Sequence, residues 1–149
     1  MEDISKRLFE KMKRMQGAEN LKLPPNCTVE MQGKIIAYEE GEYLTCSFPI
    51  LEKYNNPAGV MLGGFLPVFF DLTMGPFVYL EANKPSTSLD LNVTFIKQIS
   101  TLDNHILVTV HLIKKSKHYL ILEGKANNPK GEIVGAATSR LLILDKKNI

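Results

Sequence analysis

The chain has 149 residues, a length that suits one domain with a sizeable core. Hydrophobic residues make up 44% and charged residues 23%, which is typical of a soluble globular protein rather than a disordered one. The net charge of +2 is too small, and the basic residues are too scattered, to indicate nucleic-acid binding. We see neither a signal peptide nor the ~20 uninterrupted apolar residues of a membrane span, so we expect a cytoplasmic protein.

Residues 1–26 are expected to form an N-terminal helix and a linker. Apolar residues recur on one face of a helix over residues 1–16, where Gly17 is a suitable stop: Ile4, Leu8, Met12 and Met15. The opposite face is basic and is best explained as a solvated surface. The Pro24–Pro25 pair marks the linker.

Two strands are predicted next, at about 27–38 and 42–51, with a charged turn between them. In this hairpin Cys46 lies opposite Ile35, and Cys27 lies about 26 Å further along. A disulfide needs Cα atoms within about 7 Å, so we expect two reduced thiols, as in cytoplasmic proteins. The cysteines and the three histidines have no metal-ligand spacing, so no metal is expected.

Residues 63–82 are predicted to form one central helix that is apolar on nearly every side, and therefore buried on every side. Its apolar residues are Phe65, Leu66, Val68, Phe69, Phe70, Leu72, Met74, Phe77, Val78, Tyr79 and Leu80. Pro67 falls near the first turn, where a missing N–H costs little, whereas Pro76 is expected to kink the helix or end its regular part. The lone carboxylate of Asp71 needs a partner or a function, because burying it uncompensated costs several kcal/mol.

Four more strands are predicted, up to residue 144. Apolar and polar residues alternate over 88–95 and 106–112, a third strand covers about 118–126, and a hairpin turn at 127–132 leads into 133–144. Hairpins favour an antiparallel sheet, and a curved sheet wrapped around the central helix buries that helix most economically. We therefore predict a single α+β domain over 27–144, a tail over 145–149, and dimerisation through the apolar surface left outside.

One group of residues around the start of the central helix could carry chemistry. Gly63 and Gly64 lie where helical N–H groups are unpaired and the helix dipole is positive, and glycine lets a carbonyl approach closely. Asp71 follows about two turns later on the same face and could act as a base or a nucleophile, while Asn56 could orient water or donate to a carbonyl. These groups suffice to hydrolyse an activated ester. From spacing alone a purely structural role for Asp71, in a cap, an ion pair or an exposed kink, is equally open.

The pattern resembles the hotdog-fold acyl-CoA thioesterases, in particular the PaaI-like subgroup. The resemblance is carried by Asn56-Pro-Ala-Gly59-Val-Met-Leu62-Gly63-Gly64, by Asp71, and by Ser88-Leu-Asp90-Leu-Asn92-Val-Thr94-Phe95, and it covers about 27–144. It implies one hotdog domain, acyl-CoA and water as substrates, no cofactor, no nucleic-acid or membrane partner, and a homodimer that pairs into a dimer of dimers.

The resemblance also implies roles for the matched residues. Asp71 would be the base or nucleophile, the Gly63 N–H would polarise the thioester carbonyl with Gly64 beside it, Asn56 would position the carbonyl or the water, and Ser88, from a neighbouring strand or subunit, would hold the water. Further substrate contacts are expected from Leu62 and Phe65 and, beside the CoA phosphates, from the basic residues Lys97, Lys114, Lys115 and Lys117. The lysines could equally be solvated turn residues.

One position departs from the family pattern. The family usually has His before the two glycines, and here that position is Leu62, which cannot form the same hydrogen bonds. A module that binds acyl-CoA or a fatty acyl group without hydrolysing it therefore stays open. A dehydratase or isomerase on the same fold would need a His near the central helix, but all three histidines lie well downstream.

Overall fold

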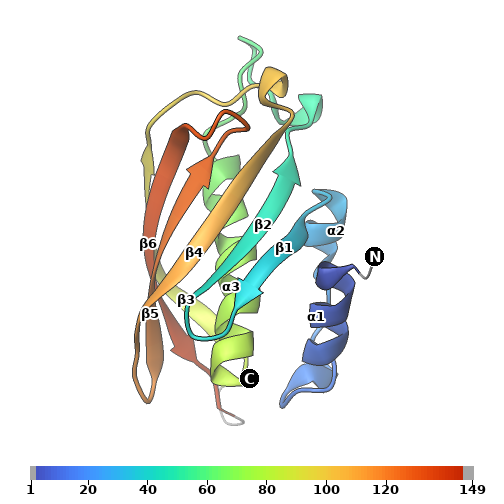
Figure 1. Cartoon of the computed structure of the whole chain (residues 1–149), viewed down its shortest axis with the longest axis vertical. Coiled ribbons are helices and arrows are strands. Elements are labelled where there is room, and N and C mark those ends of the chain that lie inside the picture. The colour runs from blue at the N-terminus through green and yellow to red at the C-terminus, as the bar shows by residue number, and fades with distance from the viewer. Residues whose placement is uncertain (1–2, 146–149) are drawn as a thin grey trace.

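The computed structural model describes residues 3–145 and shows an antiparallel six-stranded sheet that curves around one long helix, α3 (Phe65–Ala82) (Figure 1). The strands lie in the order β1-β2-β4-β5-β6-β3. Their bounds are β1 (Lys34–Glu39), β2 (Tyr43–Pro49), β3 (Ser86–Phe95), β4 (His105–Lys115), β5 (Tyr119–Asn127) and β6 (Ile133–Ile143). The predicted α+β class, with an N-terminal helix and a curved antiparallel sheet around one long helix, is thus confirmed. The order of the six strands and the central helix along the chain also agrees with the prediction.

The N-terminal region is more helical than predicted. Helix α1 (Ile4–Met12) is capped by Asp3, whose side chain accepts hydrogen bonds from N–H groups of the first turn, and a short 3₁₀ turn follows at Ala18–Asn20. The prediction of a strand from residue 27 was wrong, because Asn26–Glu30 forms a helix, α2, and β1 starts only at Lys34. A helix of five residues is too short to show its period in the sequence, and its β-branched residues imitate a strand.

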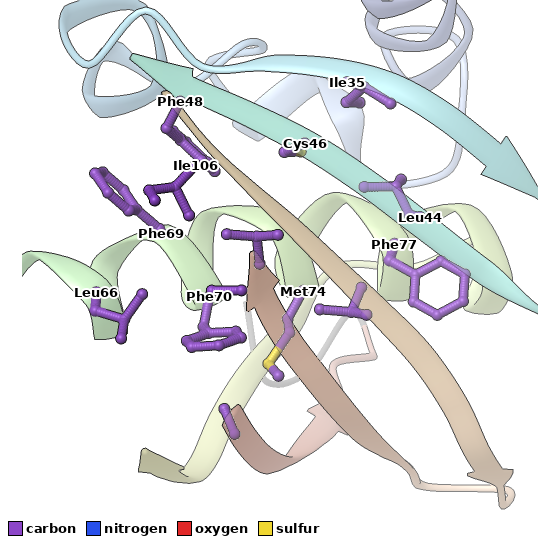
Figure 2. Close-up of a cluster of buried hydrophobic side chains, with 14 of the residues drawn as sticks. Ile35, Leu44, Cys46, Phe48, Leu66, Phe69, Phe70, Met74, Phe77 and Ile106 are labelled. Carbon is purple, nitrogen blue, oxygen red and sulfur yellow. The ribbon is translucent and has the colours of Figure 1, made fainter. Parts of the chain in front are cut away.

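The core lies between α3 and the concave face of the sheet. Figure 2 shows Phe69, Phe70 and Met74 of α3 among side chains from β1, β2 and β4, and all three are fully buried. The rings of Phe48 and Phe69 stack with centroids 4.5 Å apart. The sheet approaches so closely at Gly124 that a Cβ there would lie 2.9 Å from the Phe70 ring. The absence of side chains at such positions lets α3 lie deep in the sheet.

One face of α3 departs from the prediction that the helix is buried all round. Asp71 is exposed, and Val68, Leu72, Gly75 and Pro76 on the same side are only partly buried. The helix continues through Pro76 to Ala82, so Pro76 does not end it. Length and composition alone would let α3 cross a membrane, but it is the core helix of this domain. Composition could not reveal which side the sheet leaves uncovered.

The two edges of the sheet differ. At the β1 edge the N–H of Ile35 donates to the Ser5 hydroxyl of α1 at 3.1 Å, and the register shifts between Ile35 and Ala37. The β3 edge is ten residues long, and no other strand or helix of residues 3–145 pairs with its outer side. Leu89 and Phe95 of β3 are 49% and 58% exposed. Long apolar edges invite pairing with another chain, so β3 is the edge that is open to a partner.

The register of the first hairpin agrees with the prediction, since Cys46 lies opposite Ile35. Both cysteines are free, but Cys27 lies on α2 rather than on the first strand. Cys46 is buried, whereas Cys27 is exposed.

Candidate active site

Asp71 and Ser88 form a hydrogen-bonded pair on the surface. Ser88, near the start of β3, donates its hydroxyl to Oδ1 of Asp71 at 2.9 Å. Both side chains are exposed. The partner of the carboxylate is therefore a hydroxyl rather than a lysine, and Oδ2 can accept a proton or a hydrogen bond from water. We call Asp71 and Ser88 the aspartate half-site.

The loop before α3 fixes the side chain of Asn56. Its Oδ1 accepts hydrogen bonds from the backbone N–H groups of Ala58 at 2.9 Å and Val60 at 3.2 Å. The backbone of Asn56 also donates to the Val60 carbonyl at 2.7 Å. With Oδ1 used inside the loop, Nδ2 is the side-chain atom that can donate to a ligand. The loop thus makes Asn56 a donor.

Asn56 and Gly63 share a pocket of about 340 Å³. The pocket lies between this loop, the start of α3 and the segment 95–99, which includes Phe95 and Lys97. A Cβ on Gly63 would come within 3.4 Å of the Phe95 ring. Gly63 and Gly64 precede the first residue of α3, so their N–H groups have no helical carbonyl to bond. We call Asn56 and Gly63 the glycine half-site.

The two half-sites do not meet within one chain. Asp71 follows Gly63 by eight residues, which corresponds to about 12 Å along a helix. One thioester group cannot touch the amide at Gly63 and the carboxylate of Asp71 over that distance. Even on the same side of α3, as predicted, Asp71 and Gly63 are about two helical turns apart. Strand β3 links the half-sites, since Ser88 near its start contacts Asp71 and Phe95 at its end lies beside Gly63.

The other predicted substrate contacts lie in different places. Lys97 borders the pocket of the glycine half-site and forms an ion pair of 2.6 Å with Glu132. The Lys97 ammonium, followed by the Asn128 amide, holds the pKa of Glu132 below its usual value. Leu62 is 47% exposed, and Phe65 packs on Tyr54 with ring centroids 4.4 Å apart. Of these residues, Lys97 is the one that the structure brings to the pocket.

Lys115 and Lys117 lie at the other end of the domain. The Lys115 ammonium donates to the backbone carbonyl of Glu81 at 2.7 Å, next to the end of α3, and Lys117 follows in the turn after β4. An 18-residue helix is about 27 Å long, so these lysines are far from Gly63 of the same chain. Lys114 lies on the same part of β4.

Two features of the site region have no signal in the sequence. The Glu81 carboxylate accepts hydrogen bonds from the Tyr38 hydroxyl at 2.8 Å and from the Gly41 N–H, which fixes the end of α3 to the first hairpin. Burial, followed by the Glu81 carboxylate, raises the pKa of Tyr38. A second pocket, of about 250 Å³, lies beside Asp71 and is partly walled by the N-terminal segment. Both features depend on contacts between segments far apart in the chain, which no local pattern encodes.

No protein-family model matches the chain, and a search of curated proteins gives no significant match. Solved structures do match. The PaaI protein of Escherichia coli, from the phenylacetic acid degradation operon, is similar over 93% of this chain and 96% of its own, with a TM-score of 0.77 and 14% identity. A phenylacetic acid degradation-related protein of Ralstonia eutropha is similar over 91% of this chain and 99% of its own, with a TM-score of 0.76 and 21% identity.

A thioesterase of Haemophilus influenzae is similar over 80% of this chain and 82% of its own, with a TM-score of 0.73 and 14% identity. Identities this low establish the fold rather than the activity. The matches nevertheless extend over most of both chains in each of the three pairs, and the predicted resemblance to the PaaI-like structures is confirmed. The chain therefore has the hotdog fold of these thioesterases.

Proposed function

We propose that the protein hydrolyses acyl-CoA thioesters at a site that two copies of the chain build together. The observation that carries this proposal is the Asp71–Ser88 pair, an exposed carboxylate oriented by a hydroxyl. Support comes from the thioesterases that share the fold. The glycine half-site supplies what the pair lacks, namely amide donors beside a pocket.

Pairing of two β3 strands would unite the half-sites. In a twofold antiparallel pair, if residue i of one copy lies opposite residue j of the other, j also lies opposite i. A register that sets Ser88 opposite Phe95 of a second copy therefore brings each aspartate half-site to the Phe95 ring of the other copy. Because that ring lies beside Gly63, Asp71 of one copy would then face Gly63 of the other.

The edges of the sheet support this pairing. The β1 edge is covered by α1, while the β3 edge is long, exposes Leu89 and Phe95, and is open within the described chain. We therefore propose a homodimer through β3, which can associate further into a dimer of dimers.

The reaction needs one base and one set of donors. With Asp71 as general base, a water held by Asp71 and Ser88 attacks the thioester carbonyl carbon and gives a proton to the carboxylate. The carbonyl oxygen becomes an oxyanion, which the Gly63 N–H and Asn56 Nδ2 of the other copy stabilise. The C–S bond then breaks and the CoA sulfur takes the proton, which leaves a carboxylic acid and CoA with a free thiol. In the alternative route Asp71 attacks directly and water cleaves the resulting anhydride.

No metal or redox cofactor takes part in this scheme. Lys97 is the basic residue at the rim of the pocket. We propose that it leaves its ion pair with Glu132 and binds a CoA phosphate instead. The free cysteines suit a reducing compartment such as the cytoplasm.

A binding module is the second candidate, and Leu62 favours it. This side chain is 47% exposed beside the glycine half-site and offers no hydrogen bond to a carbonyl. A protein with this change could hold acyl-CoA without turning it over.

The experiment that separates the two candidates is thiol release from a panel of acyl-CoA esters, with melting temperature measured in parallel. Hydrolysis by the wild type that is lost in Asp71→Asn supports the enzyme. Absence of thiol release from every ester overturns the enzyme, and a melting temperature that still rises with acyl-CoA then indicates the binding module.

A further inference from the structure

A pocket of about 250 Å³ lies beside Asp71. Asp71 and Ser86 lie at its polar rim, and most of its lining is apolar. It is separate from the pocket of the glycine half-site, which shares none of its lining residues. It is therefore an apolar pocket to which the proposed mechanism assigns no part of the substrate.

One wall of this pocket comes from the N-terminal segment. Met12, Leu21 and Leu23 line it, and Met12 has no exposed surface. The Tyr79 hydroxyl of α3 donates to the Gln16 carbonyl at 2.7 Å and so ties this segment to the helix. Figure 1 shows α1 beside the C-terminal half of α3. We call residues 12–25 the N-terminal wall.

The opposite wall is α3, and the central position there is Gly75. Gly75 follows Asp71 by four residues, so the two lie one turn apart on the same side of the helix. Apart from its chain neighbours and the backbone of the helix, a Cβ built on Gly75 would meet no atom within 4 Å, so the space beside it is open. Glycine weakens a helix interior relative to alanine. Gly75 also precedes Pro76, whose ring crowds a Cβ on the residue before it, so glycine here relieves that contact and at the same time leaves the pocket free of a side chain.

The polar groups of the pocket restrict its ligand. The Asp71 carboxylate bonds to Ser88, and the Tyr79 hydroxyl bonds to Gln16. An anionic ligand would be repelled by Asp71 and find no basic side chain among the lining residues. An apolar cavity of about 150 Å³ takes a benzene ring. A pocket of 250 Å³ has room for a larger apolar group, such as a ring with a short spacer or a straight chain of medium length.

We propose that this pocket holds the acyl group of the thioester, and that Gly75 sets the longest acyl group that fits between α3 and the N-terminal wall. The inference rests on the proposed function, because it places the scissile carbonyl at Asp71. When the thioester carbonyl lies at the Asp71 carboxylate and the thioester sulfur points toward the glycine half-site of the second copy, the acyl group extends along α3 over Gly75. The substrate class is then an acyl-CoA whose acyl group is uncharged, apolar and of medium length.

The test is a series at residue 75, assayed with straight-chain acyl-CoA esters from acetyl to dodecanoyl. Gly75→Ala and Gly75→Leu should shorten the preferred chain step by step. Both put a Cβ before Pro76, so the melting temperature of each variant is measured alongside. For Gly75→Leu, kcat/KM with octanoyl-CoA relative to that with butanoyl-CoA should fall about ten-fold or more, because single methylenes change fit by about that factor. Equal losses with every ester, or an unchanged chain-length profile, would overturn the inference.

A second variant acts from the opposite wall. Leu23→Ala removes volume there, so it should shift the preference of the wild type toward longer chains and restore part of the octanoyl-CoA activity to Gly75→Leu. This compensation is not expected from a general loss of folding. If Gly75→Leu instead abolishes the dimer and hydrolyses no ester of any length, the pocket receives a second copy of the chain and the inference is wrong.

Failure of the proposed function would look different. If the wild type hydrolyses no ester, the pocket is tested by melting temperature, with octanoyl-CoA compared with CoA alone. A larger rise with octanoyl-CoA that Gly75→Leu loses would keep the acyl pocket and reject the enzyme. Equal rises with both compounds in the wild type would reject the pocket.

Discussion

The Ser88 hydroxyl donates a 2.9 Å hydrogen bond to the Asp71 carboxylate, and this bond joins the start of β3 to the uncovered face of α3. It fixes one carboxylate oxygen and leaves the other toward solvent. Because Asp71 is exposed, its side chain avoids the cost of burial that the sequence had suggested. The carboxylate is thus both solvated and oriented, as a base for water must be.

Removing the base should lower turnover. Asp71→Asn keeps the size of the side chain and its bond to Ser88, yet it should reduce kcat by about 10²–10⁴-fold, the usual contribution of a general base. Ser88→Ala should reduce kcat less, because the carboxylate remains. Ser116→Ala, in the turn after β4, is the matched control and should hydrolyse acyl-CoA at the wild-type rate. Equal rates for Asp71→Asn and wild type in a thiol-release assay would exclude Asp71 as the base.

The β3 edge should determine the oligomeric state. Leu89→Lys places a charge on the open edge and should convert the dimer into monomers, with loss of hydrolysis. Leu102→Lys is the control, because Leu102 is 92% exposed in the turn before β4 and should tolerate the charge with the dimer intact. Light scattering measures the molecular mass, and thus the oligomeric state, of both variants. A Leu89→Lys protein that stays dimeric and active would place the interface elsewhere.

Close packing of the sheet on α3 should make two glycines intolerant of alanine. A Cβ at Gly135 would lie 2.5 Å from Cδ2 of Leu66 and 3.3 Å from the Thr94 carbonyl oxygen. Gly135→Ala should therefore lower the free energy of unfolding by about 1–3 kcal/mol, the usual cost of overpacking a core. Gly124→Ala, against the Phe70 ring, should behave in the same way.

Gly75→Ala is the matched control for this packing effect. Its Cβ meets no atom within 4 Å beyond its chain neighbours and the helix backbone, but Pro76 follows directly and its ring crowds that Cβ. The better helix propensity of alanine and this contact oppose each other, so the free energy of unfolding should change by less than about 1 kcal/mol. Urea unfolding measures all three variants. A Gly135→Ala protein as stable as the wild type would contradict the packing described between β6 and α3.

The two cysteines should differ in reactivity. Cys27 is exposed, whereas burial of Cys46 raises its thiol pKa from 9.0 to about 12. Iodoacetamide at pH 8 should therefore modify one thiol of the folded protein and both thiols after unfolding, as mass spectrometry would show. Rapid modification of both thiols in the folded state would contradict the burial of Cys46.

The same shift predicts how stability depends on pH. The folded-state pKa of Cys46 is above the unfolded value, so the stability that this protonated thiol contributes is fully present below about pH 9 and is lost as pH rises toward 12. Cys46→Ala should lose part of this alkaline sensitivity in urea unfolding at several pH values.

Strong periodic patterns made most of the fold predictable. The alternation over 88–95 and 106–112 gave β3 and β4, and the long apolar run gave α3 within two residues of its start. These patterns arise because one face of the sheet packs on the core, so every second residue of a strand is buried. Helix α2 was missed because the five residues from Asn26 to Glu30 contain little more than one helical turn.

The candidate site was predictable only as a set of residue types. Asn56, Gly63, Asp71 and Ser88 could be selected by spacing, but spacing could not show that Asp71 bonds to Ser88 or that Gly63 lies about 12 Å away from Asp71 along the helix. Those relations depend on which edge of the sheet lies beside α3. The pocket over Gly75 depends on the N-terminal wall, whose contact with α3 joins segments about sixty residues apart.

The central claim is that Asp71 of one copy acts with Asn56 and Gly63 of another, and mixed dimers test it most directly. Asp71→Asn removes the base, and Asn56→Asp keeps the oxygen that holds the loop but replaces the Nδ2 donor. Each variant alone should be nearly inactive. In a mixed dimer one site combines both changes, while the other has Asp71 and Asn56 intact.

The two inactive variants are therefore unfolded together, refolded as an equal mixture and assayed for thiol release from acyl-CoA. Half of the dimers formed at random are mixed, and each has one intact site, so the mixture should regain about one quarter of the wild-type rate. A mixture that forms dimers but stays as inactive as either variant alone would contradict a site shared between two copies.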